Sequence, residues 1–239
     1  MPLSSEDLEL LRRFDTPTVC NVIELFGVRP RHVGYMDARI KACFPELPPM
    51  VGYAVTATFR AAAPPATGAY TGFEEQLELI QQLPGPAVIV IQDLDDPPAA
   101  AVFGEVMCTT YKAFGAAGLV TSGAGRDLPQ VRTLQFPVFT SGTICSHGYC
   151  HFPQVNVPVR VGGVTIRPGD LLHGDANGVT TIPHEIADRL AHACQEFVDA
   201  EAIVINYARG GNVTLEGYRK ARAEMQRRIQ ALAERLRQA

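Results

Sequence analysis

The sequence lacks the features that mark several broad protein classes. It has no basic excess, since 21 basic residues face 25 acidic ones for a net charge of −4, and no basic patch of the kind that nucleic-acid binding needs. No apolar run approaches the roughly eighteen residues of a membrane span. The first residues, Met1 to Asp7, do not resemble a signal peptide. We therefore expect a cytoplasmic protein that binds neither nucleic acid nor a membrane.

Internal repeats, low-complexity tracts and convincing linkers are also missing from the 239 residues. A chain of this length suits one large domain with a sizeable hydrophobic core. We therefore predict a single domain over residues 1–239.

The cysteines show no pattern that indicates disulfides, and without an export signal free thiols are expected. One segment, residues 145–151, raises a zinc hypothesis because it contains Cys145, His147, Cys150 and His151. Its spacing is irregular, and no second Cys or His pair stands at finger-like distance. We interpret these residues as packed or loop-capping, and the sequence leaves open whether the two histidines shape a substrate pocket.

The most informative stretch of the chain runs from residue 86 to residue 127. The apolar run at 86–91 predicts a buried strand, bounded by proline-containing segments on both sides. A helix is expected to begin at Gly104, and residues 118–121 predict a second strand. A glycine-rich loop then ends in Arg126-Asp127. Together these segments form one β-α-β unit.

The geometry of such a unit predicts a binding site. Ligands of parallel sheets lie outside the carboxyl ends of the strands, where the start of the Gly104 helix and the loop 123–127 both belong. A helix start offers about four unpaired backbone N–H groups and a partial positive charge, which suit an anion. Arg126 would grip a carboxylate or enolate oxygen, Asp127 would hold a hard cation, and Glu105 would orient water on that cation.

Simpler interpretations stand beside this one. An Arg-Asp pair in a loop is often a solvated turn, and a Glu in the first helical turn often only complements the helix dipole. A rival metal cluster, Asp93, Asp95 and Asp96, follows the first strand at the same edge, although proline-flanked acidic loops are mostly solvated turns. Asp170 and Asp175 lie next to glycines, where we predict that their side chains cap the backbone.

The remaining segments predict a scaffold of helices and strands. Ser4 and Thr16-Pro17 begin two helices, the second of which ends at Gly27. The other expected elements are an extended loop at 29–50, a strand at 51–60, a helix at 73–83, hairpins in a mixed second sheet layer from 155 onward, a long helix after Pro183, and an amphipathic helix at 215–239. The apolar side of that last helix must cover its own domain or another subunit.

The twenty residues between Glu105 and Arg126-Asp127 resemble the signature of a known family. This family comprises 4-hydroxy-4-methyl-2-oxoglutarate aldolases and proteins similar to the regulator of ribonuclease E activity A. The resemblance covers most of the chain, and its other matching segments are 15–19, Thr-Ala-Thr-Phe at 56–59, Gly-Glu-Val-Met at 104–107, 169–170 and 174–183.

The resemblance implies an α/β fold of the swivelling β/β/α type, a single layered α/β/β domain with mixed sheets and a C-terminal helix. It also implies a lyase, an aldolase or decarboxylase, that acts on 2-oxo acids with Mg²⁺ or Mn²⁺. In the implied site, the carboxylate binds to the backbone of Gly104, Glu105, Val106 and Met107. Arg126 contacts the enolate oxygen, Asp127 binds the metal, and Glu105 contacts the metal's water shell. Glu201 reaches that shell from a neighbouring subunit of a homotrimer or homohexamer.

Two function classes remain open from the sequence. The first is a lyase that acts on 2-oxo acids. Cleavage next to a 2-oxo group leaves a pyruvate enolate, and a Lewis-acid metal beside a fixed guanidinium suits the charge on the enolate oxygen. The alternative is a non-catalytic, protein-binding regulator, since some relatives are known for inhibiting a ribonuclease complex. The acid-X20-Arg-Asp motif favours chemistry, because a binding module does not need a converging metal site.

Overall fold

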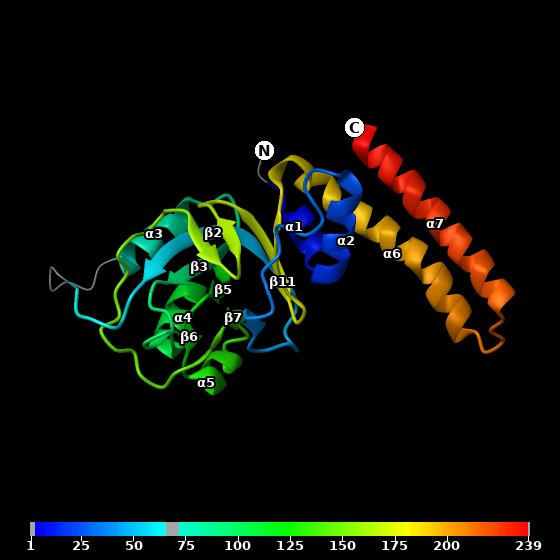
Figure 1. The fold of residues 1–239 in the computed structure, drawn as a ribbon. Helices are drawn as coiled ribbons and strands as arrows, with labels where there is room; N and C mark the ends of the chain where they lie inside the picture. Colours follow the sequence, from blue (N-terminus) through cyan, green and yellow to red (C-terminus); the bar gives the residue numbers. More distant parts are fainter. Residues whose placement is uncertain (1–2, 66–71, 239) are drawn as a thin grey trace.

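A seven-stranded mixed sheet forms the centre of the computed structural model, which describes residues 3–65 and 72–238 (Figure 1). The strand order is β1-β7-β5-β3-β2-β11-β12. The four inner strands from β7 to β2 run parallel, and β1, β11 and β12 pair antiparallel at the two sides. The strands are β1 (Lys41–Ala42), β2 (Met50–Phe59), β3 (Ala87–Asp93), β5 (Ala116–Thr121), β7 (Val138–Thr140), β11 (Leu171–Asp175) and β12 (Gly178–Ile182).

Both faces of this sheet are covered, which explains its continuous apolar runs. On one face, Ile89 and Ile91 pack with the helices α3 (Phe73–Gln82), α4 (Glu105–Ala113) and α5 (Leu128–Thr133). On the other face, Val88 and Val90 pack with the hairpin of β9 (Val159–Val161) and β10 (Val164–Ile166). This α/β/β layering confirms the predicted fold class.

A third group of apolar side chains joins the N-terminal helices to the C-terminal ones. The elements are α1 (Ser5–Leu11), α2 (Thr16–Phe26), α6 (Ala187–Arg209), which follows a 3₁₀ turn at His184–Ile186, and α7 (Leu215–Gln238). Leu232 and Leu236 are the α7 residues that enter this group. Figure 1 shows α6 and α7 as a helical hairpin that extends away from the sheet.

The local signals explain where several elements begin and end. The Ser4 side chain accepts from the backbone N–H of Asp7, and Asp15 accepts from that of Thr18, so both act as N-caps. Gly27 ends α2 in the left-handed conformation at φ 72°. The helices and strands predicted from these signals are confirmed. Ala239, the last residue of the predicted tail helix, lies outside the described residues.

One detail of the sheet prediction was wrong. Hairpins were predicted in a second layer after residue 155. The described residues form β9–β10 and β11–β12 there, but only β9–β10 lies in the second layer. The second, β11–β12, belongs to the main sheet because β11 pairs with β2 over Tyr53 to Met50. All five residues of β11 are buried, as expected for a strand inside a covered sheet.

A small parallel sheet that the sequence did not predict extends beyond the main one. Its strands follow β3, β5 and β7 along the chain and are β4 (Ala101–Phe103), β6 (Ala124–Gly125) and β8 (Gly142–Thr143). It positions the start of α4. None of the helices in residues 3–65 and 72–238 is both long and apolar enough to cross a membrane.

Candidate active site

The pairing of β4 with β6 brings the two halves of the predicted site together. Phe103 stands opposite Gly125 in this parallel pair, and the Arg126 N–H donates to the Phe103 carbonyl at 3.0 Å. The residues that follow each partner, Gly104 and Arg126, are therefore neighbours. Gly125 is required here because a Cβ would collide with the Phe103 ring.

Asp127 bridges the two segments with its side chain. It occupies the N-cap position of α5 in the left-handed conformation at φ 55°, and its carboxylate makes no capping bond to α5. Its Oδ2 instead accepts from the backbone N–H of Glu105 at 3.1 Å, in the first turn of α4. The Arg126 Nε lies 3.6 Å from the same oxygen. The carboxylate and the guanidinium are thus both held at the start of α4.

The N-terminal turn of α4 provides donors for an anion. The helical hydrogen-bond ladder begins where the Cys108 N–H donates to the Gly104 carbonyl at 3.1 Å. The N–H groups of Val106 and Met107 precede that bond, and the Glu105 N–H is taken by Asp127. Two N–H groups and the positive end of the helix dipole are therefore available to an anion, and the predicted carboxylate seat stays a prediction.

A cavity of about 210 Å³ opens over this turn. The side chains of Arg126 and Asp127 are 34% and 37% exposed, so a small molecule can reach both. The lining residues are Ala101, Val102, Phe103, Gly104, Glu105, Val106, Met107, Arg126, Asp127, His147 and Cys150. The volume suits a small metabolite better than a drug-sized ligand.

The structure does not bring Glu201 to this cavity within one chain. Glu201 lies on α6, well apart from α4 in Figure 1. Burial, with a smaller contribution from the nearby Asp15, raises the pKa of its carboxyl. Another candidate on this helix, Glu196, pairs with Arg235 of α7 at 2.6 Å. A contribution from Glu201 therefore requires a second copy of the chain and stays a prediction.

The rival acidic residues serve the backbone. Asp95 Oδ2 accepts from the N–H groups of Ala61 and Ala62 at 2.7 and 2.9 Å, and Asp93 Oδ1 accepts from the Asp95 N–H at 2.9 Å. Within the described residues, no group of three or more His, Cys, Asp or Glu side chains could hold a metal ion.

The two aspartates predicted as caps also bind backbone groups. Asp170 Oδ2 accepts from the Arg167 N–H at 2.7 Å. Asp175 accepts from the N–H groups of Thr16 and Asn177 at 3.0 and 2.8 Å. The prediction that both are structural is confirmed.

Asp93 gives a prediction for the pH dependence of stability. Its Oδ2 is buried and has no hydrogen-bond partner among the described residues, and burial raises the pKa of the carboxyl to about 6 from its ordinary 3.8. The carboxyl loses its proton at a lower pH in the unfolded chain than in the folded one. The free energy of unfolding therefore falls as pH rises from about 4 to about 6. We expect Asp93→Asn to remove this fall. The variant should be more stable than the wild type by on the order of 1 kcal/mol at pH 7.5, a value discounted for partial exposure, and equally stable at pH 4.

Thermal unfolding at the two pH values measures this gain. Asp96→Asn is the control. It removes an exposed carboxylate that contributes least among the causes of the raised Asp93 pKa, so most of the fall with pH should remain. A constant difference between Asp93→Asn and the wild type at both pH values would contradict the assignment.

Two residues of the segment that the zinc hypothesis concerned do reach the cavity. His147 and Cys150 line it, whereas the sequence had left their role open. Burial raises the pKa of the Cys150 thiol, and it raises that of Cys108 in α4 to about 12. All six cysteines are free. The thiols near the cavity therefore stay protonated and are poor nucleophiles.

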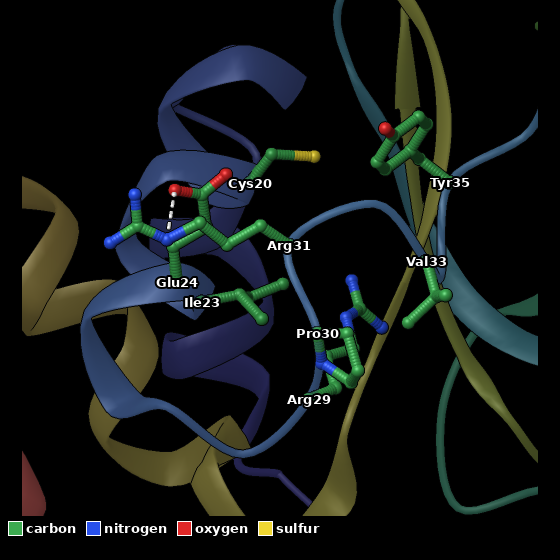
Figure 2. A pocket seen from close by; sticks show the side chains of 8 residues that line it. All are labelled: Cys20, Ile23, Glu24, Arg29, Pro30, Arg31, Val33 and Tyr35. Carbon is green, nitrogen blue, oxygen red and sulfur yellow. Dashed lines mark ion pairs between the residues drawn. The ribbon is translucent and has the colours of Figure 1, made fainter.

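Other hollows are less suited to a substrate. Figure 2 shows one between α2 and the loop 29–35, where Glu24 and Arg31 form an ion pair at 3.4 Å. Its volume of about 20 Å³ accommodates little more than one water. A hollow of about 380 Å³ lies beside the β9–β10 hairpin, and its Arg39 is already paired with Asp37 at 2.7 Å.

The comparisons with known proteins show the family of the chain. A family described as RraA-like, Aldolase/RraA, matches residues 16–181, a segment that contains α4, Arg126 and Asp127. The chain belongs to the RraA-like family.

The curated relatives of this RraA-like chain include proteins that carry a provisional aldolase name. A protein of Halalkalibacterium halodurans, which carries the provisional name 4-hydroxy-4-methyl-2-oxoglutarate aldolase, is 40% identical over 99 residues, or 41% of this chain and 47% of that protein. The chain spans less than half the length of three curated relatives that it matches at 33% to 40% identity.

Two solved structures share the fold. An uncharacterized protein from Pseudomonas syringae pv. tomato superposes with a TM-score of 0.73 at 24% identity, over 92% of this chain and 95% of that one. Streptomyces coelicolor RraAS2, described as an unusual member of the RNase ES inhibitor RraA protein family, superposes with a TM-score of 0.68 at 24% identity, over 84% and 96%. At these identities they support the RraA-like fold alone.

The donor set of the cavity fits a hard divalent cation. Asp127 and Glu105 both line it and both offer carboxylate oxygens, which Mg²⁺ and Mn²⁺ prefer. Mg²⁺ usually keeps several waters, so one direct carboxylate ligand is sufficient.

Gly104 gives a second prediction, because atoms of Asp127 and Arg126 fill the space that a side chain at this position would need. A Cβ at this position would lie 2.5 Å from Asp127 Oδ2 and 3.1 Å from Arg126 Nε. The backbone is extended at φ −153°, which alanine adopts without strain. We expect Gly104→Ala to displace the carboxylate and to lower kcat about 100-fold, with little change in melting temperature.

The matched control is Gly142→Ala in β8, where a Cβ meets nothing within 4 Å. Its kcat should equal that of the wild type. Wild-type activity of Gly104→Ala would show that the close contact of Gly104 with Asp127 has no role in turnover.

Proposed function

We propose that this chain is a divalent-metal-dependent lyase that cleaves a carbon–carbon bond of 2-oxo acids through a pyruvate enolate. The substrates would be 4-hydroxy-2-oxo acids, by aldol cleavage, and oxaloacetate, by decarboxylation. The observation that carries the proposal is the pair Arg126 and Asp127 at the start of α4, in one cavity with two N–H donors. The aldolase name of a relative supports it.

Each part of the cavity has a task in this reaction. The N–H groups of Val106 and Met107 would bind the pyruvyl carboxylate at the positive end of α4. The Arg126 guanidinium would donate to the 2-oxo oxygen, whose negative charge grows as the bond breaks, so it stabilises the transition state more than the ground state.

The metal would be held by Asp127, with Glu105 at its water shell. When bound, Mg²⁺ or Mn²⁺ would supply Lewis-acid stabilisation of the same oxygen. The Glu105 N–H bond to Asp127 would keep that carboxylate oriented, since this bond already fixes it beside Arg126.

The two reactions share one enolate. In aldol cleavage the bond between C3 and C4 breaks and its electron pair stays on C3. In decarboxylation the bond to the leaving carboxylate breaks and the pair again stays on C3. Groups that stabilise the enolate oxygen therefore serve both.

The proposal includes a cytoplasmic homotrimer or homohexamer in which Glu201 of a second copy approaches the cavity. The apolar side chain of Val106 is 77% exposed beside the cavity in the single chain, which supports a second copy that covers this rim. Exposed apolar side chains at a site rim are often buried by a substrate or another subunit.

Pyruvate release from oxaloacetate and from 4-hydroxy-4-methyl-2-oxoglutarate, with and without Mg²⁺, tests the proposal. We expect turnover that a chelator removes and that Mg²⁺ or Mn²⁺ restores. Absence of turnover on both substrates, together with tight binding of a partner protein, would favour the regulator instead.

A further inference from the structure

His147 is a cavity residue whose ring is already oriented. Its Nδ1 lies 2.8 Å from the Gly148 carbonyl oxygen. Because a carbonyl oxygen can only accept, Nδ1 carries the hydrogen and donates it. The other nitrogen, Nε2, is therefore the one that can take a proton from a molecule in the cavity.

The backbone on both sides of His147 is fixed. The Ala101 N–H donates to the Ser146 carbonyl at 2.8 Å, and the Tyr149 N–H donates to the Ala61 carbonyl at 3.0 Å. Gly148 between them has φ 51°, and a Cβ there would lie 2.8 Å from the Ala61 carbonyl. Ala101 begins β4, the strand that leads into Gly104, so His147 and the start of α4 share one support.

The other ionisable groups of the cavity are unsuited to this proton transfer. Arg126 has no lone pair that accepts a proton. Asp127 and Glu105 are assigned to the metal and its water. The Cys150 thiol, whose pKa is raised by burial, stays protonated. The imidazole remains as the group that can both take and return a proton.

We infer that His147 is the catalytic base of aldol cleavage at this site, an inference that rests on the proposed function. Nε2 takes the proton of the C4 hydroxyl, and the oxygen's electron pair forms the new C4 carbonyl as the C3–C4 bond breaks. The electron pair of that bond passes to the pyruvate enolate. The imidazolium then returns the proton to C3, which gives pyruvate and a second oxo compound, with no net proton change and no oxidant.

This role separates the two reactions of the cavity. Decarboxylation of oxaloacetate has no hydroxyl proton to remove, and solvent can protonate its enolate. A base at His147 is therefore needed for 4-hydroxy-2-oxo acids and is dispensable for oxaloacetate.

The test compares His147→Gln with the wild type on both substrates. We expect kcat for cleavage of 4-hydroxy-4-methyl-2-oxoglutarate to fall at least about 100-fold, and oxaloacetate decarboxylation to stay within about threefold. Added imidazole should restore cleavage in His147→Ala.

His151→Gln is the matched control. The ring of His151 makes the same kind of bond, with Nδ1 2.8 Å from the Tyr149 carbonyl, but His151 does not line the cavity. Its variant should cleave and decarboxylate at wild-type rates.

Three results would overturn the inference. In the first, His147→Gln cleaves the hydroxy acid at the wild-type rate. In the second, His147→Gln loses both reactions equally. In the third, the wild-type protein decarboxylates oxaloacetate but cleaves no hydroxy acid. In the first and third cases the proposed lyase function stands. A wild-type protein that performs neither reaction with Mg²⁺ would remove the proposed function itself.

Discussion

Arg126→Ala is expected to abolish pyruvate release, lowering kcat about 1,000-fold on both substrates. The guanidinium is proposed to donate to the oxygen on which charge develops, and loss of one such donor typically costs about 100- to 1,000-fold. The fold should be unaffected, because the side chain is 34% exposed and its carboxylate partner, Asp127, is 37% exposed. Steady-state kinetics and a thermal melt of the same preparation measure both effects.

Two further variants separate charge from geometry. Arg126→Lys keeps the charge but loses the planar fork, so its kcat should fall between those of the wild type and the alanine variant. Arg132→Ala is the control, since Arg132 pairs with Glu46 at 2.8 Å and does not line the cavity. Wild-type turnover by Arg126→Ala would contradict the proposed enolate contact.

Asp127→Asn is expected to remove metal binding and turnover together. The amide oxygen can still accept from the Glu105 N–H, so the start of α4 should keep its structure. The negative charge that would bind the cation is lost. We expect Mn²⁺ affinity to fall at least about 100-fold, since even outer-shell changes cost roughly 10- to 100-fold, and kcat to fall at least as much. Mn²⁺ titration followed by electron paramagnetic resonance measures the first.

The rival acidic loop provides the control for this variant. Asp96→Asn removes an exposed carboxylate after β3 and should leave Mn²⁺ affinity unchanged. If Asp96→Asn or Asp93→Asn weakened Mn²⁺ binding while Asp127→Asn did not, the metal would belong to the loop 93–96.

The start of α4 could be predicted from sequence because its signals are local. The apolar run of β3 and the glycine at 104 mark a strand and a helix start, and parallel strands share one edge at which their following residues meet. The placement of Gly104 beside Arg126 followed from that topology. The roles of these residues stay predictions.

The small sheet behind the site could not be predicted in the same way. Strands β4, β6 and β8 are two or three residues long, too short to show an alternating pattern. Their register, with Phe103 opposite Gly125, depends on pairing between segments that are distant in sequence. The same is true of β11, whose hairpin turn was visible in the sequence but whose partner β2 was not.

His147 shows most clearly what the sequence leaves undetermined. It lies in an irregular segment twenty residues after Asp127. The Ala101 N–H donates to the carbonyl of Ser146 before it, the N–H of Tyr149 after it donates to the Ala61 carbonyl, and these bonds hold the segment at the cavity. No periodicity or spacing encodes such bonds. Glu201 is undetermined for another reason, since it lies on a helix that extends away from the sheet (Figure 1).

Exchange of the pyruvate methyl protons in deuterated water tests most directly whether this cavity stabilises an enolate. Proton NMR should show the methyl signal fading with wild-type protein and Mg²⁺, after subtraction of the rate with Mg²⁺ alone. The signal should persist with a chelator or with Arg126→Ala. A stable signal with the wild type and Mg²⁺, or equal exchange by Arg126→Ala, would contradict an enolate held by Arg126 and a metal at Asp127.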